Sequence, residues 1–208
     1  MIPETISVGP LGTNCYLLAG DTDADHLLIF DPGGDAEAIL RRAAGRRIEA
    51  VLLTHGHFDH IGALDAFPDA PLYIGKMDAP MLSDPALSLA SQFGQSAPHK
   101  KPDRTLCDGD DLYFRGFSEP VRVISVPGHT PGSCAYLTGG LLFSGDTLFA
   151  RGCGRTDFPG GSDQAMADSL RRLLSLPEDT LVFPGHGPKT RIREERLFRA
   201  FFPEESAL

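Results

Sequence analysis

One short segment restricts the fold of this chain more than any other: an apolar run that leads into a cluster of histidines. Ala50–Leu53 is typical of a buried strand, and the sequence HGHFDH begins two residues after it. Three imidazoles and one carboxylate so close together are donors that bind Zn²⁺, Fe²⁺ or Mn²⁺ at neutral pH. On a loop after a strand, alternate donors can face different centres: His55 and His57 one, Asp59 and His60 the other.

Three further donor residues follow predicted strands in the same way. His129 lies in PGHTPG, Asp146 in FSGDT and His186 in PGHGP. Each alone is more typical of a structural turn than of a ligand, but five of the seven histidines lie at strand-to-loop junctions bracketed by glycine. Because strand ends converge at one edge of a sheet, we expect these side chains to meet there. Asp31, in FDPG, is equally consistent with a simple turn aspartate.

The order of predicted elements indicates two similar halves, each with strands followed by helices. Two sheets packed face to face with helices outside would accommodate this pattern, and no linker divides the chain, so we expect one domain over residues 1–208. Residues 84–105, rich in Ser, Gln, Pro and Lys, predict a long surface loop that covers an active site. The predicted strands are Ile6–Val8, Cys15–Leu18, Leu27–Phe30, Ala50–Leu53, Val121–Val126, Ala135–Leu137, Leu141–Phe143 and Leu181–Phe183, and the predicted helices are Ala36–Arg47 with Asp35 as N-cap, Asp163–Leu174 and Ile192–Phe202.

Composition narrows the classes of function. The formal net charge is −9, which disfavours nucleic acid and anionic membranes as partners. The N-terminus has neither a basic region nor an apolar one, and no apolar stretch approaches membrane-spanning length, so we expect a cytoplasmic protein. Four cysteines without a CxxC pair predict reduced thiols rather than a cysteine zinc site. Cys153 has no evident base beside it, and we expect a packed thiol rather than a nucleophile.

The motifs, in this order along nearly the whole chain, resemble those of the metallo-β-lactamase fold superfamily. The resemblance implies an αββα sandwich of two mixed β-sheets flanked by helices, with a two-metal site at one edge. It also implies that Asp31 orients a ligand without binding metal. The implied ligands are His55, His57 and His129 for the first metal, Asp59, His60 and His186 for the second, and Asp146 as a bridge between them.

Within the superfamily, the opening GPLGTNCY and the phrase PGHGP are similar to those of short, glyoxalase II-like bacterial members, which include hydroxyacylglutathione hydrolases. The β-lactamases of the commonest subclass have a cysteine where this chain has Asp146, which argues against an antibiotic-hydrolysing role. Only 22 residues follow His186, too few for the helical domain with which full-length glyoxalase II grips glutathione. The stretch GCGRTDF is also similar to the iron-dependent persulfide dioxygenases. In it, Arg155 and Asp157 are consistent with a salt-bridged rim or with an Arg155 that holds a substrate carboxylate.

The resemblance therefore predicts a hydrolase that cleaves thioesters or related esters, such as hydroxyacylglutathione, by attack of a hydroxide held by two divalent ions. Zinc is the favoured metal, with iron, a mixed iron–zinc pair or manganese as alternatives. Asp59 and Asp146 are the expected catalytic carboxylates, with Asp59 the candidate for proton handling. The alternatives are an iron-dependent sulfur dioxygenase and a lactonase or phosphodiesterase. The expected partner is a small thioester, and a homo-oligomer is left open.

Overall fold

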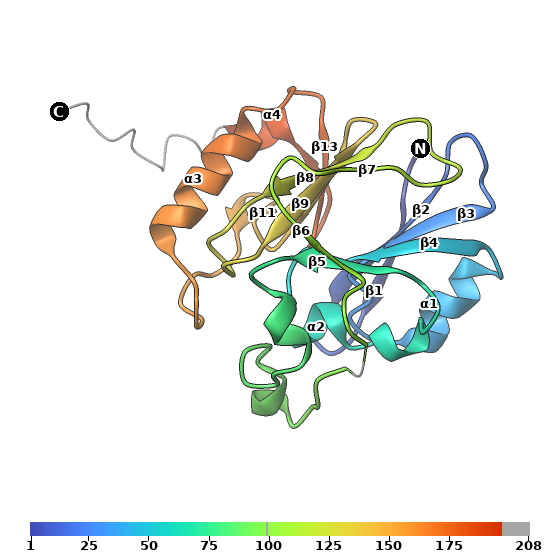
Figure 1. The fold of residues 1–208 in the computed structure, drawn as a ribbon. Helices are drawn as coiled ribbons and strands as arrows, with labels where there is room; N and C mark the ends of the chain where they lie inside the picture. Colours follow the sequence, from blue (N-terminus) through green and yellow to red (C-terminus); the bar gives the residue numbers. More distant parts are fainter. Residues whose placement is uncertain (99, 197–208) are drawn as a thin grey trace.

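The computed structural model describes residues 1–98 and 100–196, which form two six-stranded sheets packed face to face (Figure 1). The first sheet has the order β1-β2-β3-β4-β5-β6; its first three strands are antiparallel neighbours and the later pairings are parallel. Its strands are β1 (Glu4–Val8), β2 (Thr13–Ala19), β3 (His26–Phe30), β4 (Arg47–Leu52), β5 (Leu72–Gly75) and β6 (Arg104–Leu106).

The second sheet has the order β14-β13-β10-β9-β8-β7, and within it only β10 and β13 pair in parallel. A separate two-stranded ribbon, β11 (Leu148–Phe149) with β12 (Gly152–Cys153), follows β10. The strands of the sheet are β7 (Asp111–Leu112), β8 (Val121–Ser125), β9 (Cys134–Thr138), β10 (Leu141–Gly145), β13 (Leu181–Pro184) and β14 (Thr190–Arg191).

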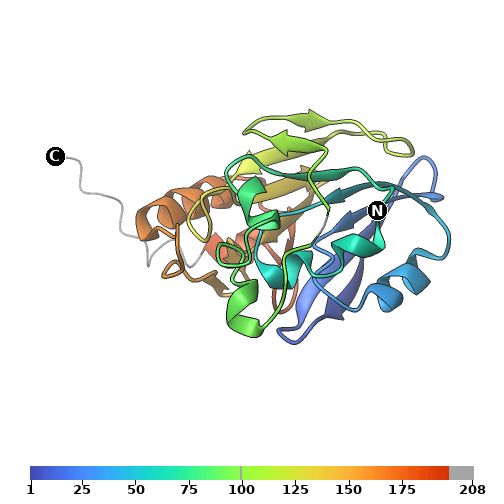
Figure 2. The ribbon, with the colours of Figure 1, turned by 60° about the horizontal axis from the view of Figure 1, so that its bottom comes forward.

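Three apolar layers hold the sandwich together. Between the sheets, Tyr16 and Phe30 of the first sheet pack against Phe143 of the second, and the rings of Phe30 and Phe143 are stacked with centroids 3.8 Å apart. Helix α1 (Ala36–Ala43) covers the outer face of the first sheet and α3 (Asp163–Leu174) that of the second, on opposite sides in Figures 1 and 2. The predicted αββα architecture is confirmed.

The remaining helical segments are short. Helix α2 (Phe58–Ile61) lies within the histidine motif, so the second half of that predicted loop is a helical turn. The others are the 3₁₀ turns η1 (Leu64–Ala66), η2 (Ala79–Leu82) and η3 (Ala90–Phe93), and helix α4 (Ile192–Glu195).

Two helix predictions need correction. Helix α1 ends at Ala43 rather than at position 47, because Ala44 and Gly45 both adopt positive φ values, 51° and 75°, which a helix cannot continue through. Asp35 is the N-cap residue, but its carboxylate accepts a hydrogen bond from the Gly9 amide instead of capping the helix. Helix α3 has the predicted bounds, with Ser162 accepting from the Ala165 amide. Beyond α4, positions 197–202 of the last predicted helix lie outside the described residues.

The cover segment and the cysteines also differ in part from expectation. Residues 84–105 are largely irregular as predicted, yet they contain η3 and the start of strand β6, and position 99 lies outside the described residues. All four cysteines are free thiols, but Cys153 is exposed, so the prediction of a packed thiol was wrong. Partial burial of its sulfur, with Asp163 nearby, raises the pKa of the Cys153 thiol, which disfavours a nucleophilic role.

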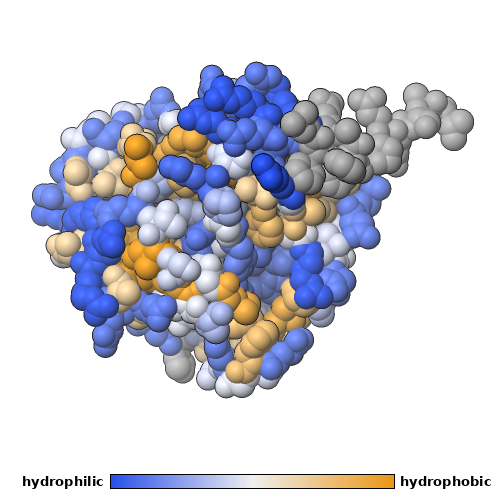
Figure 3. All heavy atoms as spheres, turned by 180° about the vertical axis from the view of Figure 1, so that it is seen from behind, coloured by the Kyte–Doolittle hydropathy of each residue, from blue (hydrophilic) through white to orange (hydrophobic). Residues whose placement is uncertain are grey.

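Figure 3 shows one face on which hydrophilic residues separate several hydrophobic patches. Across the described part of the chain, no helix is long and apolar enough to cross a membrane.

Candidate metal centre

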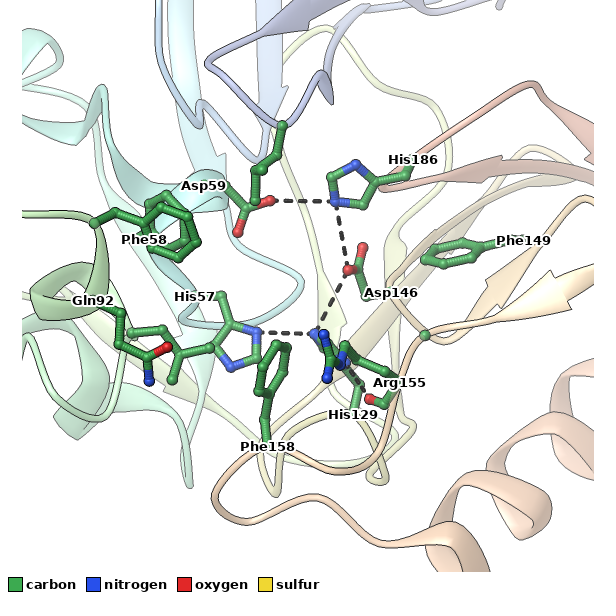
Figure 4. Close-up of a pocket in the computed structure, with 14 residues that line it drawn as sticks. His57, Phe58, Asp59, Gln92, His129, Asp146, Phe149, Arg155, Phe158 and His186 are labelled. Atoms are coloured by element: carbon green, nitrogen blue, oxygen red, sulfur yellow. Dashed lines mark hydrogen bonds and ion pairs between the residues drawn. The ribbon is translucent and has the colours of Figure 1, made fainter.

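The predicted donor residues meet at one edge of the sandwich. Loops after β4, β8, β10 and β13 bring them there, and Figure 4 shows five of them facing a common space. Among the described residues, three groups of donors lie close enough for each group to hold a metal ion, with the ligand atoms of a group within 4.8 Å of one another. These groups are His55, His57 and His129; His55, His60 and Asp146; and Asp59, His60 and His186.

The first of these groups, the histidine triad His55–His57–His129, is buried and consists only of imidazoles. Nδ1 of His57 lies 2.9 Å from Nε2 of His129. Burial, together with the neighbouring His129, lowers the pKa of His57 to about 3. Burial, together with His60, also lowers the pKa of His55 well below its usual value. These rings are therefore neutral at pH 7, the state in which imidazole binds metal.

The mixed triad Asp59–His60–His186 has the opposite electrostatics. Oδ2 of Asp59 lies 3.2 Å from Nε2 of His186 and 3.5 Å from Nε2 of His60. Burial alone would lower the pKa of both histidines, but neighbouring carboxylates outweigh it and raise the pKa of His60 well above normal and that of His186 as well. The same contacts, chiefly with His60, lower the pKa of Asp59 despite its burial.

Asp146 lies between the two triads. Its Oδ1 is 3.4 Å from Nε2 of His60, and its Oδ2 is 3.6 Å from Nε2 of both His129 and His186. Burial would raise the pKa of Asp146, but the adjacent His60 lowers it overall, so the carboxylate is charged at neutral pH. A charged carboxylate beside both triads is placed as a bridging ligand requires.

The donor set fits divalent metal ions on the evidence of its own atoms. Nε2 of His55, Nε2 of His60 and Oδ1 of Asp146 are buried and have no hydrogen-bond partner, which is costly unless another group satisfies them. Gly185 keeps the space open: a Cβ atom there would lie 2.1 Å from Oδ1 of Asp146 and 2.8 Å from Cε1 of His60. Only a residue without a side chain allows β13 to end so close to the donors.

Asp31 is placed to orient a histidine of each triad. It is 2% exposed, and its Oδ2 lies 2.9 Å from Nδ1 of His60. Its two oxygens also accept hydrogen bonds from the amide and hydroxyl of Thr54. Because Oγ1 of Thr54 donates to Asp31, it is free to accept from Nδ1 of His55, 3.1 Å away. Both rings then direct Nε2 toward the cluster, which is the orienting role that the resemblance implies.

The backbone carbonyl of Arg155 orients His129. Its Nδ1 lies 2.6 Å from the carbonyl oxygen of Arg155, which can only accept, so Nδ1 carries the proton and Nε2 faces the donors.

Two supporting residues were missed by the sequence analysis. Thr13 donates its hydroxyl hydrogen to Oδ2 of Asp59 at 2.8 Å. Asp78, fully buried, accepts hydrogen bonds from the Gly56 amide, the Thr130 hydroxyl and the Gly132 amide. It therefore ties the loop of the histidine motif to the loop that carries His129. Thr13 belongs to the GPLGTNCY opening, but nothing in that phrase shows that its hydroxyl reaches Asp59, and no local motif marks Asp78, because the partners of both residues are distant in sequence.

Arg155 and Asp157 form the predicted salt-bridged rim. Nε and an Nη of Arg155 lie 2.6 and 2.5 Å from the two oxygens of Asp157, and this pairing lowers the pKa of Asp157 to about 2. The Arg155 guanidinium also lies over the Phe158 ring, 4.2 Å from its centroid. The pairing with Asp157 is the first of the two predicted roles, and a substrate carboxylate would have to share the guanidinium with it.

A pocket of about 520 Å³ opens above the donors (Figure 4). Its floor contains His57, Asp59, His129, Asp146 and His186, and the rest of its lining is mostly apolar. The sequence analysis did not identify the apolar lining, which comes from several separate segments: Leu11, Phe58, Leu89 with Phe93, Phe149 and Phe158.

The sequence of this chain matches the family model of the metallo-beta-lactamase superfamily over residues 8–186, and the chain belongs to that superfamily. Among curated proteins, "Probable metallo-hydrolase YqgX" of Bacillus subtilis is 40% identical over 198 residues, covering 91% of this chain and 92% of the relative. "Hydroxyacylglutathione hydrolase" of Aeromonas hydrophila is 45% identical over 168 residues, covering 78% of this chain but only 57% of that protein.

Solved structures agree with the fold. The crystal structure of the BLEG-1 B3 metallo-beta-lactamase superimposes with a TM-score of 0.89 and 39% identity, over 98% of this chain and 100% of the other. TTHA1623 in a di-iron-bound form has a TM-score of 0.80 and 37% identity, over 94% of this chain and 97% of the other.

Proposed function

We propose that this protein is a dinuclear metal-dependent hydrolase that cleaves thioesters. One observation carries the proposal: the histidine triad and the mixed triad lie side by side with the Asp146 carboxylate between them. The first ion would be held by the histidine triad, the second by the mixed triad, and Asp146 would contact both. Membership of the superfamily and a relative called a probable metallo-hydrolase support the hydrolase class.

Two divalent ions, when bound, lower the pKa of a water molecule that they share and polarise a carbonyl oxygen. The protein contributes by fixing the donors: Asp31 and Thr54 orient His60 and His55, and the Arg155 carbonyl orients His129. Zinc and iron both suit this mixture of imidazole and carboxylate, and the di-iron form of TTHA1623 supports testing iron alongside zinc.

The charge of the carboxylates favours a thioester over an amide or alkyl ester. The pKa values of Asp59 and Asp146 are lowered, so both are proton acceptors at neutral pH rather than general acids. Oδ2 of Asp59 accepts the Thr13 hydrogen bond, which holds the carboxylate at the pocket floor. A thiol with a pKa near 8.5 leaves as thiolate without a proton donor, whereas an amine or alkoxide needs one.

The test uses protein loaded separately with zinc and with iron. We expect S-lactoylglutathione or a simpler thioester to release free thiol, without oxygen uptake when glutathione persulfide is supplied. His57→Ala is the inactive control, and Tyr113→Ala, an exposed aromatic residue outside the pocket, is the neutral control. Oxygen consumption by the iron form with no thioester cleavage would instead identify a sulfur dioxygenase.

A chromogenic β-lactam belongs in the same experiment, because BLEG-1 is 39% identical over almost the whole chain. We expect slower turnover of the lactam than of the thioester, because lactam opening expels an amine nitrogen that needs a proton. Faster lactam turnover would assign the chain to antibiotic hydrolysis.

A further inference from the structure

The wall of the pocket differs in chemistry from its floor. Above the charged donors, four aromatic rings and two leucines surround a space of about 520 Å³. Two of these apolar residues are strongly exposed: Phe93 at 52% and Leu11 at 48%. Exposed apolar atoms at the mouth of a pocket release water when an apolar group covers them, and this favours binding of such a group.

The wall on one side is attached directly to the metal-binding segment. Phe58 begins α2 between two donors, His57 and Asp59, and the Phe93 ring stacks on it with centroids 4.3 Å apart. The Phe58 amide donates to the carbonyl oxygen of Ser88, which joins the cover segment to the same helix. A group seated against Phe93 therefore lies beside the reacting centre, not at a remote surface.

The other walls also place rings against the donors. Phe158 packs edge-on to His57 and lies near His129, with centroids 5.5 and 6.2 Å apart. Phe149 lies beside His186 at 6.1 Å, on the opposite side of the cluster in Figure 4. Aromatic rings therefore lie beside donors on more than one side of the pocket.

The wall offers few partners for a negatively charged substrate group. Arg155 is the one lysine or arginine side chain among the described residues that line the pocket, and its Nε and one of its Nη atoms already pair with Asp157. A substrate with free carboxylates, such as a glutathione ester, would have to compete with Asp157 for this cation. It would also approach a chain of net charge −9.

We infer that the substrate carries an uncharged, apolar substituent on the scissile carbonyl, seated against the Phe58–Phe93 stack, and that Phe93 determines specificity for it. This inference rests on the proposed thioester hydrolysis and names its substrate class. The apolar substituent is the acyl chain or the thiol, and in either case a hydrocarbon group contacts the same two rings.

Two substrate series test the inference. The first lengthens the acyl group, from acetyl to butyryl to hexanoyl, on one neutral thiol; the second keeps acetyl and lengthens an alkyl thiol. We expect kcat/KM to rise by about fourfold per methylene in at least one series, the gain expected for a buried CH₂. S-lactoylglutathione should be a poorer substrate than the best member. Equal rates along both series would overturn the inference.

Substitutions at Phe93 and Leu87 test which residue causes the chain-length dependence. Phe93→Ala should flatten the chain-length dependence of kcat/KM and raise KM for the longest substrate, and Phe93→Leu should restore part of that dependence. Leu87→Ala is the matched control, since Leu87 is an exposed apolar residue of the same segment that does not line the pocket. A length dependence that persists in Phe93→Ala, or is lost in Leu87→Ala, would show that Phe93 does not set specificity.

A binding measurement separates failure of the apolar site from failure of the proposed reaction. Calorimetry with the metal-loaded protein compares butyrate, hexanoate and octanoate, which share one carboxylate and differ only in chain length. If no thioester is cleaved but affinity rises with length and falls in Phe93→Ala, the apolar site stands and the reaction assignment fails. If affinity is independent of length, the apolar site is overturned whatever reaction the protein catalyses.

Discussion

The two donor triads lie within one site yet differ in how their charges are balanced. The histidine triad has no carboxylate among its three members, and burial keeps His55 and His57 neutral. The mixed triad pairs Asp59 with His60 and His186, and their pKa values move apart as in an ion pair. Without metal, the mixed triad is held by its own charges, whereas the histidine triad has the hydrogen bond between His57 Nδ1 and His129 Nε2 and no opposite charges among its members.

The two triads therefore differ in whether a metal ion must displace protons from the histidines when it binds. An ion entering the histidine triad replaces no bound protons on His55 or His57 at pH 7, since both rings are already neutral. An ion entering the mixed triad has to displace the proton of His60, whose pKa is raised well above normal. Asp146 and Asp31 couple the two, the first by lying between them and the second by contacting His60 directly and His55 through Thr54.

The largest effect is expected from Asp146→Ala, which removes the group common to both triads. Activity should fall by at least about a hundredfold, the scale of losing one strong electrostatic contribution. Steady-state kinetics on metal-loaded protein measure this, with Arg155→Ala as the comparison, because Arg155 lies at the rim and should cost less. Near-native turnover in Asp146→Ala would mean that the two triads act without it.

Asp59→Ala should separate the triads. Metal content should fall from about two ions per chain to about one, because the remaining histidine triad is complete without Asp59. Elemental analysis after dialysis against the metal measures the ratio. If both ions are retained, or both are lost, the two triads are not independent binding sites.

Asp31→Asn should weaken both ions, since an amide nitrogen placed toward Thr54 cannot accept its hydrogen bond and a neutral amide removes the charge that faces Nδ1 of His60. The expected loss of metal affinity is about 10- to 100-fold, as for other residues that orient ligands.

Thr54→Val sharpens the same test, because it removes only the hydroxyl that links Asp31 to His55. It should weaken the first ion more than the second, as measured by competition with a chromogenic chelator. An equal loss of affinity for both ions would disprove that Asp31 acts on His55 through Thr54 and on His60 by a separate contact.

The smallest expected effect is the pH dependence of metal binding. The pKa of His60 is raised well above normal, so this ring holds a proton in the metal-free protein near neutral pH, and the pKa of His186 is raised as well. Affinity for the second ion should therefore increase as pH rises toward the pKa of His60. The His57 contribution to the first ion should be flat above pH 6, because the pKa of His57 is about 3. Calorimetry in two buffers of different ionisation enthalpy counts the released protons, and equal release for both ions would contradict the comparison.

The sequence by itself determined the donor chemistry of the site. The strand Ala50–Leu53 followed by HGHFDH indicated a metal centre, and the glycine-bracketed positions of His129, Asp146 and His186 indicated that they would join it. The layered fold also followed from strand and helix order, together with the family resemblance. These features are readable because strands, turns and metal donors are specified by residues close together in the chain.

Tertiary structure alone decided how the donors are held and what surrounds them. The link from Asp31 through Thr54 to His55, the tie made by Asp78 and the Phe58–Phe93 stack all join residues more than 20 positions apart. Helix α1 likewise ended early because Ala44 adopts a left-handed conformation that its residue type does not announce. Aromatic residues scattered over three segments carry no pattern of their own; only the packing of the two sheets and their loops makes them one wall.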